Sequence, residues 1–205
     1  MDFIKTKEKN TYTIINNSKY IISFLSHHNL IVSTTDDSIT ITADSIESLQ
    51  TFNKNNKNNT DFFINNFIFD IGCQILLLKE SHIGIKHFSL SDIIILHNNI
   101  FLFINPNMLY KLLDKSLDKS LDKLLPQYMH GTFSLTSIDM TSIFLPPEFN
   151  NTKKYYYYTT SYYSFAKLLL HIFNIEIDDI ENTSLYFFCK RCLIENPLDR
   201  TFNFI

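Results

Sequence analysis

The stretch GIKHFSLSDIIILHNNIFLFIN (residues 84–105) contains two apolar runs, Ile93–Leu96 and Ile100–Ile104, separated by three polar residues. Two short β-branched runs joined by a polar tripeptide predict a β-hairpin. Pro106 should end the second strand, because proline has no N–H to donate to a neighbouring strand. The sequence therefore predicts a buried hairpin near the middle of the chain.

Helical patterns lie on both sides of this hairpin. Residues 62–79 are predicted to form a buried helix, because large apolar side chains recur there at helical spacing. Those side chains are Phe63, Phe67, Ile71, Ile75 and Leu78. After the hairpin, residues 155–173 become increasingly apolar and helical, and residues 184–193 are predicted to form a last helix that ends near Pro197.

A tandem repeat, LLDKSLDKSLDKLL, occupies residues 112–125. Its leucines recur every four residues with Asp-Lys pairs between them, which predicts an amphipathic helix that Pro126 ends. Two interpretations remain open for this segment. It is either a surface helix that arose by repeat slippage or a helix that binds a partner.

The N-terminal quarter of the chain has short β-branched segments in place of long helical patterns. Residues 11–16, 19–25, 30–35 and 38–43 are short and rich in β-branched side chains, so they predict four strands, or one helix among strands. Residues 45–52 are predicted to open a helix, and the polar run of residues 53–60 is predicted to be a loop.

Composition limits the classes of function. The 205 residues are 45% hydrophobic and 19% charged with a net charge of -3, which fits a globular domain and argues against nucleic-acid or membrane partners. Three cysteines, a polar start from Met1 to Asn10 and short apolar runs predict an intracellular, cytoplasmic protein. The abundance of Asn, Ile, Lys, Tyr and Phe suggests an AT-rich genome such as that of a large DNA virus.

Five segments together resemble the eukaryotic protein kinases. Residues 62–81 are similar to the helix before the catalytic loop, and residues 84–105 resemble that loop with its hairpin. FLPPEF (residues 144–149) resembles the A-P-E motif, and SYYSFAKLLLHIF (residues 161–173) follows it as the central kinase helix does. CLIENPLDR (residues 192–200) resembles the C-L-x-x-x-P-x-x-R ending.

The resemblance implies a fold class and a domain division. We expect an α+β, protein kinase-like fold with a mostly helical C-lobe over residues 45–205 and a small, reduced, β-rich N-terminal part over residues 1–44. In the family, the A-P-E glutamate and the late arginine form a buried ion pair. The resemblance therefore implies that Glu148 and Arg200 are in contact.

The catalytic groups of the family are missing from this sequence. The N-terminal part has no Gly-rich loop, and Lys19 matches the ATP-binding lysine by position alone. In one alignment, which we favour, His87 takes the place of the catalytic base and Asp92 that of the metal-binding asparagine. In the other, His87 matches the family histidine and Ser89 takes the place of the base. Asn105 stands where the metal-binding D-F-G aspartate belongs.

These replacements leave phosphotransfer poorly equipped. Hard cations such as Mg²⁺ prefer anionic oxygen, and Asn105 offers a neutral amide instead. We therefore expect no catalytic residue and no cofactor, with Asp92 the one candidate metal ligand. The alternative is a divergent active kinase that uses ATP and Mg²⁺ through Asp92.

Three further features have competing interpretations. Ser161 falls on the buried aspartate that orients the catalytic loop in kinases. Cys189 and Cys192 have C-x-x-C spacing without a second pair, so burial is favoured over zinc or redox chemistry. The tyrosines at positions 155–158, 162 and 163 serve either the core or an interface.

Taken together, the sequence predicts a catalytically inactive, pseudokinase-like protein that binds or scaffolds an unidentified protein partner. An unrelated α+β protein is the remaining hypothesis, and it predicts that Glu148 and Arg200 lie far apart.

Overall fold

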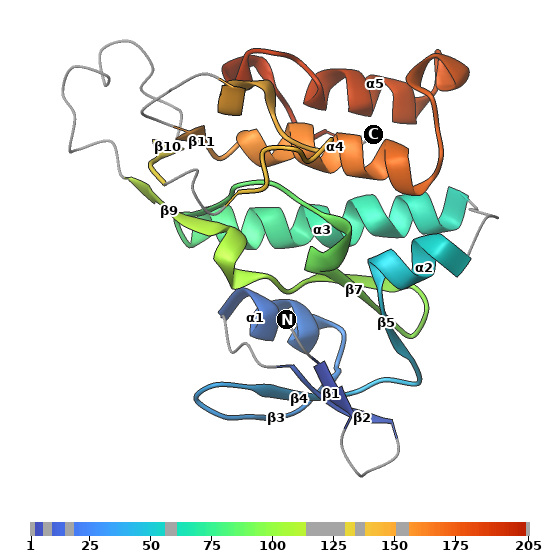
Figure 1. Ribbon diagram of the computed structural model, residues 1–205. Coiled ribbons are helices and arrows are strands. Elements are labelled where there is room, and N and C mark those ends of the chain that lie inside the picture. Colours follow the sequence, from blue (N-terminus) through green and yellow to red (C-terminus); the bar gives the residue numbers. More distant parts are fainter. Residues whose placement is uncertain are drawn as a thin grey trace. The chain divides into compact units, whose positions relative to one another are not determined.

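The computed structural model describes residues 3–5, 10–14, 19–55, 61–113, 130–133, 138–150 and 156–203 (Figure 1). The chain divides into two compact units. Unit 1 comprises residues 1–77 and 90–107, and unit 2 comprises residues 78–89 and 108–205. The predicted boundary between residues 44 and 45 was taken from the two lobes of the protein kinases, and it stays a prediction.

Unit 1 begins with an antiparallel sheet in the order β1-β2-β4-β3. Its strands are β1 (Phe3–Lys5), β2 (Thr11–Ile14), β3 (Ile31–Thr34) and β4 (Ile39–Thr42). Helix α1 (Lys19–His27) connects β2 to β3, so the alternative of one helix among strands holds here. Tyr20, Ile21, Phe24 and Leu25 are its buried residues, and their spacing is that of one helical face rather than of a strand.

A second sheet of unit 1 has the order β5-β7-β8. The predicted hairpin is confirmed as β7 (Ile93–Leu96) and β8 (Ile100–Phe103), with Ile93 opposite Phe103. The predicted helix at residues 45–52 is only partly right. Its first residues form β5 (Ile46–Ser48), which pairs with β7, and α2 (Leu49–Asn55) follows.

Helix α3 (Asp61–Glu80) confirms the helix predicted over residues 62–79. Within unit 1 its side chains satisfy the outer edge of β8. The Gln74 amide donates to the Phe101 carbonyl at 2.8 Å and accepts from the Phe103 N–H at 2.9 Å. Asp70 accepts from the Phe101 N–H at 2.9 Å. The helix thus supplies partners that a further strand would otherwise give to this edge.

Unit 2 contains a third antiparallel sheet in the order β11-β10-β9-β6. Its strands are β6 (Ile83–Ile85), β9 (Leu109–Leu113), β10 (His130–Gly131) and β11 (Tyr156–Tyr157). The Tyr110 ring packs closely against both Gly84 and Gly131, where an added Cβ would lie 2.4 Å and 2.9 Å from ring atoms. Glycine at these two positions lets the strands approach that ring.

Two helices of unit 2 pack against each other, α4 (Thr160–Ile172) and α5 (Ser184–Cys192), drawn in orange and red in Figure 1. The last predicted helix is therefore confirmed, whereas the helix predicted from residue 155 begins five residues later, after β11. Phe165 and Phe188 contribute fully buried rings from α4 and α5.

The predicted fold class is wrong in its proportions. The structure is a mixed α+β protein, 46% helical and 22% strand, with five helices and three sheets over the residues described. Strands are not confined to a small N-terminal part, because β5 to β11 all follow residue 45. Of these strands, the sequence predicted only the β7–β8 hairpin, and it missed β10 and β11 since they have two residues each, too few for an alternating pattern to show.

Two further predictions concern the leucine repeat and the membrane. The leucine repeat at residues 112–125 lies outside the described residues, apart from its first two leucines, which end strand β9. In the part of the chain that the structure covers, no helix has both the length and the apolar character needed to cross a bilayer.

Candidate functional site

Asp92 and Asn105 meet at the base of the β7–β8 hairpin in unit 1. Asp92 closes a short 3-10 helix just before β7, and Asn105 lies two residues after β8. Hairpin pairing brings these two ends of the hairpin together, and the Ile104 N–H donates to the Asp92 carbonyl at 2.8 Å. Asp92 is 2% exposed. The hairpin itself therefore creates this pairing of side chains.

A side-chain hydrogen bond joins the two residues. The Asn105 Nδ2 atom donates to Asp92 Oδ1 at 2.6 Å. The orientation of the amide follows from its other end, because Asn105 Oδ1 accepts from the Asn107 backbone N–H at 3.1 Å. The N–H side of the amide thus faces the carboxylate, and its oxygen is engaged elsewhere.

This arrangement is poorly suited to holding a metal. A magnesium ion needs several oxygen ligands in octahedral geometry, and here an N–H donor points at the one carboxylate of the pair. Across the described residues no group of three or more His, Cys, Asp or Glu side chains is arranged to hold a metal ion. Asp92 and Asn105 could supply at most three side-chain oxygens, and the one from Asn105 only after its amide turned over.

His87 belongs to unit 2 and is not placed at an open site. It lies two residues after β6, is 4% exposed, and its Nδ1 atom is 3.2 Å from the Phe88 carbonyl oxygen. Its buried Nε2 atom has no hydrogen-bond partner among the residues described. A buried ring of this kind cannot reach a substrate hydroxyl without a rearrangement, whichever of the two alignments applies.

Ser164 holds the segment after His87 in place, a role that kinases give to the aspartate whose position Ser161 takes in the resemblance. The Phe88 N–H donates to Ser164 Oγ at 2.7 Å, and both residues are fully buried. Ser161 instead donates to the Tyr158 carbonyl one turn earlier at 3.0 Å. The signal for Ser164 was available in the sequence, since a hydroxyl within the apolar part of a buried helix needs a partner.

The structure brings Glu148 and Arg200 together within unit 2. Arg200 Nη1 and Nη2 donate to Glu148 Oε1 and Oε2, each at 2.7 Å, in a bidentate pair. Each residue is 3% exposed. Arg200 also donates to the Ile194 and Glu195 carbonyls at 2.6 Å and 2.9 Å. Every group of this pair serves structure, because its charges and hydrogen bonds are mutually satisfied.

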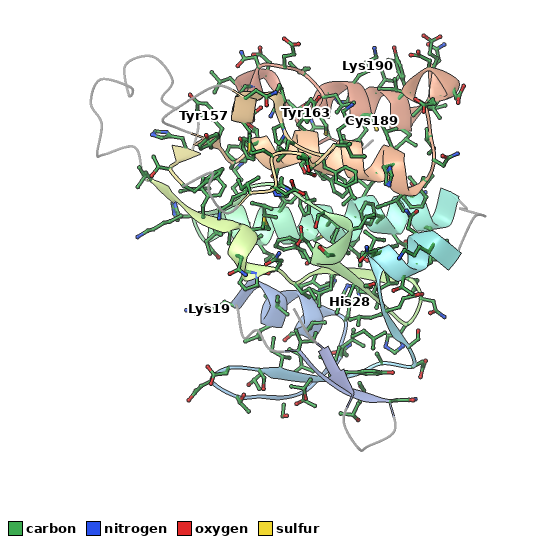
Figure 2. The ribbon with its side chains drawn as sticks, in the orientation of Figure 1. Lys19, His28, Tyr157, Tyr163, Cys189 and Lys190 are labelled. Atoms are coloured by element: carbon green, nitrogen blue, oxygen red, sulfur yellow. The ribbon has the colours of Figure 1, made fainter. Side chains whose placement is uncertain are left out.

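The C-x-x-C cysteines are buried in the core of unit 2. Figure 2 shows Lys190 extending from the outer side of α5, whereas Cys189 lies on the inner side and is fully buried. Burial raises the pKa of the Cys189 thiol to about 12 and also raises that of Cys192. Both thiols therefore stay protonated at neutral pH, which suits neither metal binding nor redox chemistry.

The tyrosine cluster is largely part of the core. Tyr156 and Tyr162 are buried, and Tyr157, Tyr158 and Tyr163 are half-buried, with Tyr157 and Tyr163 labelled in Figure 2. Tyr155 lies outside the described residues. Packing therefore accounts for most of this cluster. Lys19, at the start of α1, is exposed to solvent.

A groove of about 300 Å³ runs along α4 in unit 2. Its apolar lining includes Phe144, Ile175 and Leu193, and its polar lining includes Lys167 and His171. The His171 ring packs edge-on against Phe144 with centroids 5.3 Å apart. Ile143 also lines the groove with 66% of its surface exposed.

Neither a scan of protein-family models nor a search among curated proteins finds a match to this chain. The kinase resemblance therefore depends on the residues quoted above and on the local geometry that they adopt.

Proposed function

We propose that this chain is a degenerate relative of the eukaryotic protein kinases that binds a protein partner and does not transfer phosphate. The order of elements supports the resemblance. Helix α3, the hairpin β7–β8, the Pro147–Asn150 turn, α4 and α5 follow one another as the matching kinase segments do. The contact between Glu148 and Arg200 adds support, because an unrelated protein was expected to keep them apart.

The observation that carries the proposal is the hydrogen bond between Asn105 and Asp92. The resemblance assigns both positions to metal binding, and here a neutral amide donates to the carboxylate at 2.6 Å. The amide N–H lies where a metal-loaded site would need a cation. The side chains at the two positions that the resemblance assigns to metal binding are thus bonded to each other.

The place of the catalytic base leads to the same conclusion. Under the favoured alignment it holds His87, which is buried with its Nδ1 atom against a backbone carbonyl. Under the other it holds Ser89, which has no carboxylate. The hydrogen bond between Phe88 and Ser164 holds this loop in place. Neither His87 as it is buried nor Ser89 is suited to accept a substrate proton.

Binding of a protein partner is supported by exposed apolar surface. Ile143 beside the α4 groove is 66% exposed, and large exposed apolar side chains that adjoin a groove are typical of binding surfaces. The polar rim, which includes Lys167, His171 and Glu176, offers polar contacts around that apolar floor.

Thermal unfolding with ATP and Mg²⁺ tests the catalytic half of the proposal. The wild-type chain should keep its melting temperature, because a ligand that does not bind the folded state cannot stabilise it. Asn105→Asp restores a second carboxylate and should gain a Mg²⁺-dependent upward shift. The control is Asn65→Asp, which adds the same charge at an exposed position of α3 and should gain none.

A Mg²⁺-dependent shift in the wild type would contradict the proposal. So would autophosphorylation that Asp92→Ala abolishes, which would establish the alternative of a divergent active kinase.

The binding half is tested with a partner that co-purifies in stoichiometric amount and rebinds the pure chain. Ile143→Asp should weaken that complex at least about tenfold, roughly 1.4 kcal/mol. The matched control is Phe69→Asp on α3, since Phe69 is exposed to 63% but belongs to unit 1. Failure to obtain any rebinding partner, or equal effects of both substitutions, would count against a partner surface in unit 2.

A further inference from the structure

A buried carboxylate and an imidazole face each other in unit 1. Asp70 lies on α3 and is 4% exposed, and His28 follows the last residue of α1 (His28 is labelled in Figure 2). His28 Nε2 is 4.0 Å from Asp70 Oδ1, too far for a direct hydrogen bond. The two atoms are therefore close but not yet bonded.

Both groups are otherwise held in place. Asp70 Oδ2 accepts from the Phe101 backbone N–H at 2.9 Å, which fixes the carboxyl group on the edge of β8. The His28 ring packs on Phe24, with ring centroids 4.8 Å apart. Asn29, in the left-handed region at a φ of 56°, directs the chain away from α1 immediately afterwards. The imidazole thus has little freedom to find another partner.

The imidazole nitrogen that faces Asp70 lacks a partner. His28 Nε2 is buried and accepts or donates no hydrogen bond within the part of the chain that the structure describes. A buried polar atom without a partner costs free energy, typically about 1–3 kcal/mol. The arrangement can be completed by one proton between Oδ1 and Nε2, together with a closure of about 1 Å.

We propose that Asp70 and His28 form a proton-operated latch that ties the C-terminal end of α1 to α3 on mild acidification. In the closed latch the protonated Asp70 carboxyl donates to neutral His28 Nε2. In the open latch Asp70 is a carboxylate and neutral His28 carries its proton on Nδ1, so Nε2 has no hydrogen to donate to Asp70. This inference does not depend on the kinase resemblance.

The electrostatic surroundings favour this placement of the proton. Burial raises the pKa of Asp70 to about 6, opposed by the Phe101 N–H, which favours the carboxylate. Burial and the neighbouring His27 lower the pKa of His28. Both shifts favour the proton on the carboxyl group over the proton on the imidazole.

The other groups that act on the pair are few. On α1 the facing group is His27, whose ring centroid is 5.7 Å from that of His28. On α3 it is Cys73, whose thiol pKa is raised by burial and by Asp70. From β8 the contact is the Phe101 N–H, which is neutral. None of these brings a fixed positive charge that would hold Asp70 ionised.

The sign of the pH dependence follows from the raised pKa. The folded state binds the Asp70 proton at higher pH than the unfolded state, whose carboxyl has a pKa near 3.8. The latch therefore adds stability at acidic pH, and this stability is lost as the pH rises through about 6. The lowered pKa of His28 acts in the opposite direction below its ordinary value of 6.5.

The test combines an NMR titration of the Asp70 side-chain carboxyl with thermal unfolding between pH 8 and pH 5. We expect the carboxyl to titrate with a midpoint near 6. The melting temperature of the wild type relative to that of Asp70→Asn should rise as the pH falls from 8 to 5, because the opposing contribution of His28 is present in both proteins. Asp70→Asn places a permanent N–H donor opposite Nε2, so this variant should lose the part of the pH dependence that comes from Asp70. Asp36→Asn, at an exposed carboxyl, should keep the wild-type profile.

Substitution at the imidazole tests the coupling directly. His28→Gln presents an amide N–H that favours the carboxylate, so the Asp70 midpoint should fall by roughly one pH unit, about tenfold in proton affinity. His27→Gln, at the exposed neighbour, should leave that midpoint within a few tenths of a unit of the wild type.

An Asp70 midpoint below 5 in the wild type, or one that both His28→Gln and His27→Gln leave unchanged, would overturn the latch. This holds even if Asp70→Asn fails to fold, because the titration needs only the wild type and the histidine variants.

Discussion

Two buried carboxylates in different units of this protein have hydrogen-bond donors of different charge. Glu148 in unit 2 meets the Arg200 guanidinium through two parallel hydrogen bonds of 2.7 Å. Asp92 in unit 1 meets the neutral amide of Asn105 at 2.6 Å. Full charge compensation is thus present where a pair has a structural role. At Asp92, which the kinase resemblance assigns to metal binding, the partner is instead a neutral donor.

Breaking the charged pair should have the largest effect. Arg200→Met leaves the Glu148 carboxylate buried without its counter-charge, and losses of this kind are about 3–5 kcal/mol of unfolding free energy. Urea unfolding followed by circular dichroism measures the loss. The double variant Glu148→Gln with Arg200→Met should regain part of that stability. No recovery would mean that the arginine acts mainly through its bonds to the Ile194 and Glu195 carbonyls.

The tether of the loop after His87 should come next. Ser164→Ala leaves the buried Phe88 N–H without its acceptor, at a cost of roughly 1–3 kcal/mol in unfolding free energy. Ser161→Ala is the matched control on the same helix, and its hydroxyl bonds only to the carbonyl of the preceding turn. Equal losses in the two variants would contradict a special role for Ser164.

A second carboxyl group introduced beside Asp92 should make stability depend on pH. Asn105→Asp places two carboxyl groups in contact, so the shared proton is held more tightly and the apparent pKa of the pair rises. Stability should therefore be intact at acidic pH and decline by about 1–2 kcal/mol as the pH rises through that raised pKa. Added Mg²⁺ should restore it at pH 7. A variant as stable at pH 8 as at pH 5 without metal would show that the carboxyls separate.

Thiol labelling should show the smallest effect. In the wild type, half-exposed Cys73 should react first with a disulfide reagent, whereas buried Cys189 and Cys192 should be protected. The Cys192 thiol donates to the Thr201 carbonyl next to Arg200. Arg200→Met should therefore expose Cys192 by local opening, about tenfold faster for each 1.4 kcal/mol lost there. Cys73 in unit 1 serves as the internal control, and its rate should not change.

Long periodic segments were predictable from sequence, and short irregular contacts were not. Helix α3 and the β7–β8 hairpin were found because each places many apolar side chains at one period. Helix α1 was the ambiguous case, since Ile21 and Ile22 suit a strand as well as a helix. The strands β10 and β11 have two residues each, and their pairing partners lie far away in the sequence.

The candidate site divides in the same way. The contact of Glu148 with Arg200 was expected from family resemblance alone, because no local pattern connects residues 52 positions apart. The hydrogen bond from the Phe88 N–H to Ser164 was missed. Matching to a family aligns residues by position and points to Ser161, whereas a hydrogen bond depends on which face of α4 meets the Phe88 N–H. The unpaired His28 Nε2 gave no sequence signal at all.

By itself, the sequence determined the residue types available for chemistry, the apolar periods of the long helix and the hairpin, and the lack of an acidic residue at position 105. Tertiary structure alone decided which polar groups meet. Apolar burial is non-directional and can be read from periodicity, whereas a buried carboxylate is stabilised or stranded by a single donor within about 3 Å, wherever the fold brings it from.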